Sequence, residues 1–257
     1  MPKAEVIRSA ANPLLKEIGR AIARGGLTGD GLAVAETFHL LEEALGSEWE
    51  VRKVLAAESA AARLDVPANV PLIPVEDRLI ERVSATETSQ GVIALVKPRA
   101  WTVPELFRGK ALVVVLDGVQ DPGNAGSIVR AAEAFGATGV VFLKGTVSPF
   151  NPKTLRAAAG SLFRVPFVHG MEAGAAREAL EQNGVDLFAA VPAGRSLADT
   201  DLSGRCGLIV GSEARGVSAA LRAGAREVSI PTSGVESLNA AVAAAILLYE
   251  ARRQRGT

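Results

Sequence analysis

Polar side chains that can bind or activate a ligand stand directly after apolar runs of the chain. Asn124 lies in a turn that follows the apolar run 112–116, and Arg130 lies about two turns into the helix expected over 125–135. An apolar run without alternation is typical of a strand buried on both faces of a parallel sheet. Such sheets hold ligands at the carboxyl ends of their strands, so an amide and a guanidinium at this position indicate a ligand site. A plain connecting turn with a solvated arginine is the alternative interpretation.

Two further loops place polar side chains in the same way. The apolar run 207–211 is followed by Glu213, and the run 227–230 leads through a glycine loop to Ser237 and Asn239. Taken singly, each could be a helix cap and nothing more, and Ser237 is the predicted N-cap of the last helix. Because the carboxyl ends of parallel strands share one edge of a sheet, the three loops together predict a single site.

Several familiar chemistries lack their sequence signatures. The chain has no G-x-G-x-x-G after a strand, no G-K-[ST] phosphate loop and no H-E-x-x-H pair. The single Cys206 excludes an internal disulfide framework and argues against a cysteine-built zinc site. His39 and His169 stand far apart and lack the context of a hydrolase triad. We therefore expect no metal, and the common nucleotide-binding and metal-dependent enzymes are not indicated.

Composition limits the remaining classes. The 28 basic and 28 acidic residues balance to a net charge of zero, so a nucleic-acid partner would need a local basic patch. Aromatic residues make up only 4%, which argues against a passive RNA-binding module built on stacking. The N-terminus has no signal-peptide core and no apolar stretch reaches membrane-spanning length. The sequence thus predicts a soluble cytoplasmic protein with no membrane contact.

The periodicity of apolar residues predicts alternating strands and helices, an α/β fold with mostly parallel pairing in its second half. Prolines at 98 and 104 mark a linker, so the predicted organisation is a smaller domain over 1–97, a linker over 98–110 and a second domain over 111–257. The strands expected are 32–35, 51–56, 70–73, 91–96, 112–116, 139–143, 165–168, 186–191, 207–211 and 227–230. The helices expected are 13–23, one carrying Phe38, Leu41 and Leu45, 76–83, 125–135, 153–160, 173–183, 219–223 and 238–255.

The three loops, in this order at the end of an α/β domain, resemble the three motifs of the SpoU (TrmH-type) branch of the SPOUT RNA methyltransferases. The matching segments are 121–126 with Arg130, 211–216, and 230–231 with 237–239, and the resemblance extends over about 111–253. The first half is similar to the family's L30e-like substrate-binding domain, especially at 12–16 and 89–94. It departs from the family at 35–37, where a Glu-Gly pair is common, and at Ser89, where histidine is frequent.

The resemblance implies a deep trefoil knot at the carboxyl end of the sheet, a homodimer, and S-adenosylmethionine bound in the knotted loops. The cofactor-binding positions that it implies are Val191, Val210, Gly211, Ile230, Ser237 and Leu238. The implied reaction is methyl transfer to a ribose 2′-hydroxyl of rRNA, 23S rRNA above all. A tRNA 2′-O-methyltransferase, a resistance-type rRNA methyltransferase, and a knotted RNA-binding or assembly protein without catalysis are the alternatives.

The resemblance assigns catalysis to Arg130, supported by Asn124, Glu213, Ser237 and Asn239. A guanidinium keeps its proton in proteins, so we expect Arg130 to bind phosphate and stabilise developing alkoxide charge rather than to act as a literal base. The local basic patch predicted to contact RNA consists of Arg130, Lys153, Arg156, Arg164 and Arg215.

Overall fold

The computed structural model describes residues 5–86 and 88–256. Backbone contacts divide the chain into two compact units, one formed by Met1–Ala100 with Phe150–Arg164 and the other by Trp101–Pro149 with Val165–Thr257. Within the described ranges, no helix combines the length and the apolar character that a membrane crossing requires.

The first unit is a four-stranded mixed sheet with helices. Its strands run in the order β1-β4-β2-β3, and only the β2–β3 pair is parallel. The core gathers Ile18, Leu55, Ile80 and Ile93. Its elements are α1 (Pro13–Arg24), β1 (Ala33–Glu36), α2 (Phe38–Leu45), β2 (Glu50–Ala57), α3 (Glu58–Ala61), β3 (Leu72–Val75), α4 (Asp77–Val83), β4 (Val92–Lys97), α6 (Pro152–Ala158) and η2 (Ser161–Phe163). The predicted elements are present with ends shifted by up to two residues, and the one-turn helix α3 is an addition.

The segment that carries α6 and η2 belongs to this unit, although it lies within the sequence range 111–257. The ring of Trp49 packs against Phe150 and Phe163, with centroids 6.2 and 4.9 Å apart. Arg156 donates to the buried carboxylate of Glu36 at 2.6 Å, which also accepts from the backbone N–H of Ala85. Aromatic packing and a partly buried ion pair thus attach this segment to residues more than a hundred positions away.

Thr37 has a backbone conformation that glycine adopts more readily. Its φ is 107° and its ψ is 150°, a region that costs a residue with a side chain about 1–3 kcal/mol. The resemblance noted in the sequence implies glycine at this point, so the departure at 35–37 coincides with local strain. The Thr37 hydroxyl offsets part of this cost by accepting from the N–H of Leu40 as the N-cap of α2.

Replacing Thr37 with glycine is expected to stabilise the first unit. Relief of the strain exceeds the few tenths of a kcal/mol lost at the cap and the added freedom of the unfolded chain, for a net gain of about 1 kcal/mol. Thermal unfolding of Thr37→Gly should therefore show a raised Tm, with Thr28→Gly as a control at an ordinary backbone conformation. A lowered Tm in Thr37→Gly would contradict the strain argument.

The second unit is a six-stranded sheet with the order β10-β8-β9-β5-β6-β7, and all five pairings are parallel. The prediction of a mostly parallel α/β sheet is thereby confirmed. Its elements are η1 (Val103–Phe107), β5 (Leu112–Asp117), α5 (Pro122–Ala134), β6 (Gly139–Leu143), β7 (Phe167–Met171), α7 (Ala173–Gln182), β8 (Asp186–Ser196), η3 (Leu197–Asp199), β9 (Cys206–Gly211), α8 (Ala219–Arg222), β10 (Arg226–Ser229) and α9 (Ala240–Arg255).

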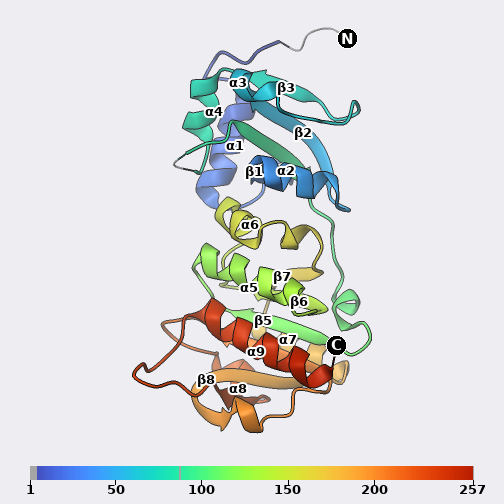
Figure 1. The fold of residues 1–257 in the computed structure, drawn as a ribbon, viewed down its shortest axis with the longest axis vertical. Helices are drawn as coiled ribbons and strands as arrows, with labels where there is room; N and C mark the ends of the chain where they lie inside the picture. The colour runs from blue at the N-terminus through green and yellow to red at the C-terminus, as the bar shows by residue number, and fades with distance from the viewer. Residues whose placement is uncertain (1–4, 87, 257) are drawn as a thin grey trace. The chain divides into compact units, whose positions relative to one another are not determined.

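Helices cover both faces of this sheet. Val113 and Val115 of β5 point into a core that includes residues of η1, α7 and α8. The alternate residues of β5 point to the opposite face, where α5 and α9 pack side by side (Figure 1). The strand predicted over 165–168 begins later, at Phe167. Five of the thirteen positions of the expected linker, 103–107, lie in η1, which buries Leu106 and Phe107 in this core.

Arg255, on the last turn of α9, ties that helix to two loops of the second unit. Its guanidinium donates to the carbonyl oxygens of Lys110 at 3.0 Å, Ala111 at 3.2 Å, Leu202 at 3.3 Å and Gly204 at 2.5 Å. The neighbouring Arg253 pairs only with Glu250, one turn away on the same helix. Two arginines that stand two residues apart on the same helix therefore make very different numbers of tertiary hydrogen bonds.

Arg255→Ala is expected to lower the free energy of unfolding by about 2–3 kcal/mol, because four carbonyls lose a charged donor. The matched variant Arg253→Ala should leave it nearly unchanged, since an exposed ion pair contributes little. Denaturant unfolding of both variants measures the difference. Equal losses in the two variants would show that the carbonyl bonds of Arg255 are not what stabilises the helix end.

Candidate active site

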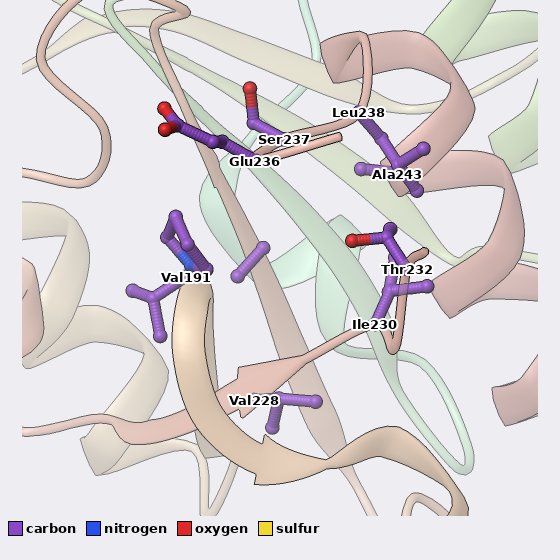
Figure 2. A pocket seen from close by; sticks show the side chains of 10 residues that line it. Val191, Val228, Ile230, Thr232, Glu236, Ser237, Leu238 and Ala243 are labelled. Atoms are coloured by element: carbon purple, nitrogen blue, oxygen red, sulfur yellow. The ribbon is translucent and has the colours of Figure 1, made fainter. Parts of the chain in front are cut away.

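A cleft lies at the carboxyl ends of β8, β9 and β10, and we call it the strand-end cleft. It consists of two adjoining pockets that share Ala190, Pro192, Glu236, Ser237, Leu238 and Ala243. Figure 2 shows Val191 on one side of the first pocket and Thr232, Leu238 and Ala243 on the other. All six positions predicted to bind cofactor line this cleft: Val191, Val210, Gly211, Ile230, Ser237 and Leu238.

The wall next to Val191 is formed where β8 leaves the sheet. Ala189 of β8 pairs with Glu227 of β10, and the next pairing joins Arg195 to Val228, so residues 190–194 are extruded from the ladder. Their backbone N–H and C=O groups are therefore unpaired in the β8–β10 ladder, and the Gly194 carbonyl oxygen accepts instead from the Ser229 hydroxyl at 2.9 Å. The extruded segment ends at Gly194, where the chain returns to the ladder. Glycine is needed there because a Cβ would lie 2.7 Å from the backbone carbonyl carbon of Glu227.

Gly211 ends β9 where the chain folds back on itself. A Cβ at this position would overlap the backbone of Gly216 and Val217, and an isolated bridge joins Ser212 to Gly216. Glycine is required here for the tight return of the loop that carries Glu213.

The polar residues of the three loops form one chain of hydrogen bonds. Asn239 donates from Nδ2 to Oδ1 of Asn124 at 2.9 Å, and Asn124 donates from Nδ2 to Oε1 of Glu213 at 2.5 Å. The two bonds fix which way the Asn124 amide faces. Three segments separated by up to 115 positions therefore meet at the mouth of the strand-end cleft.

Helix caps anchor two of the three members of this chain, Asn239 and Asn124. The Asn239 side-chain oxygen accepts from the N–H groups of Ala241 and Val242, so Asn239 is the N-cap of α9. The prediction that Ser237 caps this helix is wrong, and Ser237 instead lines the cleft from the preceding loop. At the other helix, Asp121 caps α5 by accepting from the N–H of Asn124 at 2.7 Å.

Arg130 lies on α5, six residues beyond Asn124. At about 100° per residue the two side chains point about 120° apart around the helix. Arg130 is exposed, is not among the residues that line the strand-end cleft, and has no hydrogen bond or ion pair to any residue of 5–86 or 88–256. Its guanidinium is therefore directed away from the cleft of its own chain.

The comparisons with known proteins agree with the motifs. The family model described as the SpoU rRNA Methylase family matches residues 111–249, and the MRM3-like substrate binding domain matches residues 12–94. The chain belongs to the SpoU rRNA methylase family. The resemblance seen in the sequence is thereby confirmed for both halves.

Relatives of this SpoU-family protein align over most of its length. The Bacillus subtilis protein named 23S rRNA (guanosine(2553)-2′-O)-methyltransferase RlmP is 35% identical over 250 residues, covering 96% of this chain and 98% of that protein. The Xanthomonas axonopodis 23S rRNA (guanosine-2′-O-)-methyltransferase RlmB is 38% identical over 70% of this chain and 77% of its own length. The AdoMet-bound rRNA methyltransferase of Sinorhizobium meliloti has a TM-score of 0.84 at 27% identity, covering 97% of this chain and 98% of that structure.

The basic residues predicted to contact RNA in this SpoU-family protein fall in both units. Arg156 and Arg164 lie in the first unit and form ion pairs with Glu36 and Glu43. Lys153 is exposed in the same unit, and Arg130 and Arg215 are exposed in the second. Ion pairing satisfies two of the five guanidinium or ammonium groups within the protein, and their contact with RNA stays a prediction.

Pro192, Thr232 and Glu236 are among the cleft-lining residues that sequence reasoning missed. A signal was present for each. Pro192 cannot donate to a strand ladder and so marks the point where β8 leaves the sheet. Thr232 and Glu236 belong to the same glycine loop as Ser237, and a loop that contributes one residue to a site often contributes its neighbours.

Proposed function

We propose that this protein transfers a methyl group from S-adenosylmethionine to a ribose 2′-hydroxyl of 23S rRNA in the cytoplasm. The observation that carries the proposal is the hydrogen-bonded chain from Asn239 through Asn124 to Glu213 at the mouth of the strand-end cleft. The names of the relatives, two of which act on 23S rRNA at a guanosine 2′-oxygen, support the substrate class.

The strand-end cleft fits the cofactor by its chemistry. Val191, Ile230 and Leu238 offer apolar contact to an adenine ring, and the extruded segment 190–194 offers backbone groups unpaired in the β8–β10 ladder to its polar edge. Glu236 adds a carboxylate near the cleft, which suits a cation. When bound, S-adenosylmethionine supplies a methyl group on a positively charged sulfur, ready for attack by an oxygen nucleophile. The trefoil knot that would surround this cleft remains part of the proposal.

The protein's own residues would position the RNA oxygen and stabilise its charge. Asn124, with its amide fixed by Asn239 and Glu213, is proposed to hold the nucleotide sugar. Arg130 is proposed to bind the adjacent phosphate and the developing alkoxide, which requires a cation and no deprotonated guanidine. Lys153 and Arg215 would add contacts to the RNA backbone.

A homodimer would bring Arg130 of one protomer to the strand-end cleft of its partner. Two observations support this assembly: the direction of Arg130 on α5, and the apolar side chains exposed on α9. Val242 is 48% exposed and Tyr249 is 56% exposed, which is unusual for side chains of this size on a helix beside a core.

Val242→Glu together with Tyr249→Glu is expected to convert the dimer to a monomer, because two buried carboxylates would face the partner without a counter-charge. Light scattering should give twice the 26.6 kDa of one chain for the wild type and a single chain for the variant. Ala220→Glu on α8, which covers the opposite face of the sheet, should leave the dimer intact. A monomeric wild type would contradict the assembly.

Mapping 2′-O-methyl groups in the RNA of cells with and without the gene tests the proposed function. The expected result is the loss of one 2′-O-methylation from 23S rRNA in the deleted strain and its return on complementation. A change confined to tRNA would redirect the substrate to the alternative class. Unchanged 2′-O-methylation in all RNA would contradict the proposal.

A further inference from the structure

A polar hollow in the first unit lies outside the strand-end cleft and has no role in the proposed reaction. It is lined by Phe38, His39, Glu42, Arg63, Ser89 and Gln90. These residues come from α2, from the segment after α3 and from the turn before β4, so three separate parts of the unit contribute to it. The hollow combines one aromatic ring, two basic side chains, one carboxylate and one amide. Such a set is suited to binding a ligand rather than to packing.

Arg63 and Phe38 provide a flat surface in this hollow. The guanidinium carbon of Arg63 lies 4.7 Å from the centroid of the Phe38 ring. Arg63 is exposed, and the described part of the chain contains no ion pair or hydrogen bond to its guanidinium, although Glu42 lines the same hollow. A guanidinium stacked on one side and free on the other is a platform on which a second planar group can stack.

The position of Phe38 is held by its neighbours. The backbone N–H of Phe38 donates to Oε1 of Gln90 at 3.0 Å. The Nε2 group of Gln90 is therefore left to donate to a ligand. Thr37, directly before Phe38, holds the strained φ of 107° described above. Strain of this kind persists where the surrounding structure fixes it, and it is often found at functional sites.

The carboxylate of Glu42 determines which planar group fits. No residue of the described ranges donates a hydrogen bond to this side chain, so both of its oxygens remain acceptors. A guanine base presents two N–H donors, N1–H and the 2-amino group, side by side on one edge, and a carboxylate can accept from both. The O6 oxygen on the same edge is an acceptor for the Nε2 group of Gln90.

We propose that this hollow binds an unpaired guanine base of the RNA, stacked on Arg63 and read by Glu42 and Gln90. The inference rests on the proposed function, because it takes the partner to be RNA. It deepens that function by giving the first unit a base-specific contact, where phosphate contacts alone would give affinity without sequence preference.

Binding of a fluorescently labelled oligouridylate with one central guanine to the full chain tests the proposal. Wild type should bind it more tightly than the same oligonucleotide with inosine, which lacks the 2-amino group, and Glu42→Gln should remove this preference. Arg63→Ala and Arg63→Lys should each weaken binding by about tenfold, because stacking a base on a side chain contributes about 1–3 kcal/mol and a lysine lacks the plane. Arg20→Ala, an exposed arginine of α1 outside the hollow, should weaken it by less than about twofold.

The outcomes separate this inference from the proposed function. Equal binding of guanine, inosine and plain oligouridylate by the wild type would overturn the inference, as would Arg63→Lys binding like the wild type. Neither result bears on methyl transfer, which is measured with S-adenosylmethionine and a 23S rRNA transcript in parallel. A protein that prefers guanine yet transfers no methyl group would overturn the proposed function and leave the base-binding hollow standing.

Discussion

Arg130→Ala is expected to lower kcat for RNA methylation by about 10²- to 10³-fold, the usual loss when a charge that stabilises an oxyanion is removed. The side chain is exposed and no described residue pairs with it, so folding should be unaffected. Since Arg130 is proposed to contact the RNA phosphate and the developing alkoxide rather than the cofactor, the Kd for S-adenosylmethionine should change by less than about twofold. Turnover with a 23S rRNA transcript and calorimetric titration of the cofactor measure the two quantities.

The control for Arg130→Ala is Arg108→Ala. Arg108 is an exposed arginine of the same unit that pairs with Glu105 and does not line the strand-end cleft. It should retain wild-type kcat. Arg130→Lys keeps the charge without the planar fork, so partial activity is expected from it. Full activity in Arg130→Ala would remove this residue from the mechanism, and the dimer argument built on its direction would lose its functional basis.

Asn124→Asp is expected to lower kcat by about 10²-fold. This is the loss in rate that a displacement of about 1 Å of a positioning group can cause. The substitution changes one nitrogen to oxygen, so size and shape are kept. It removes the donor to Glu213 and sets two carboxylates against each other over a distance that is now 2.5 Å. Like charges at this separation repel, so the loop should move or one carboxylate should take up a proton.

Rescue by a second substitution makes this prediction specific. Glu213→Gln in the Asn124→Asp background supplies an amide donor to the introduced carboxylate, and it should recover part of the lost activity. Glu213→Gln alone should cost less than Asn124→Asp, because it removes only the charge. A double-mutant cycle of kcat gives the coupling energy. Additive losses would mean that the hydrogen bond between Asn124 and Glu213 does not position the reacting groups.

Local pattern was sufficient to predict most strands and the position of the site. The apolar runs at 112–116 and 207–211 became neighbouring strands β5 and β9, and their loops came together because parallel strands end on the same edge. Ser237 and Asn239 could not be separated as caps from sequence, since both residue types accept from helix N–H groups and they stand two positions apart. In the structure Asn239 is the cap, and it also donates a tertiary hydrogen bond to Asn124 that local sequence does not record.

Long-range packing explains the features that sequence did not predict. The run 186–191 reads as an ordinary strand, and its continuation to Ser196 with 190–194 extruded depends on how β10 pairs with it. Arg156 and Arg164 were predicted to contact RNA because they are basic and lie near matched motifs. Their ion pairs with Glu36 and Glu43 join positions about 120 residues apart, a contact that no local periodicity records.

The most direct test of the account is to identify the atom that receives the methyl group. The wild-type protein is incubated with S-adenosylmethionine carrying a deuterated methyl group and an unmodified 23S rRNA transcript, and the digested nucleosides are resolved by mass spectrometry. The account predicts the label on a ribose 2′-oxygen, and its absence when Arg130→Ala replaces the wild type. Label on a base, or no label in any nucleoside, would contradict it.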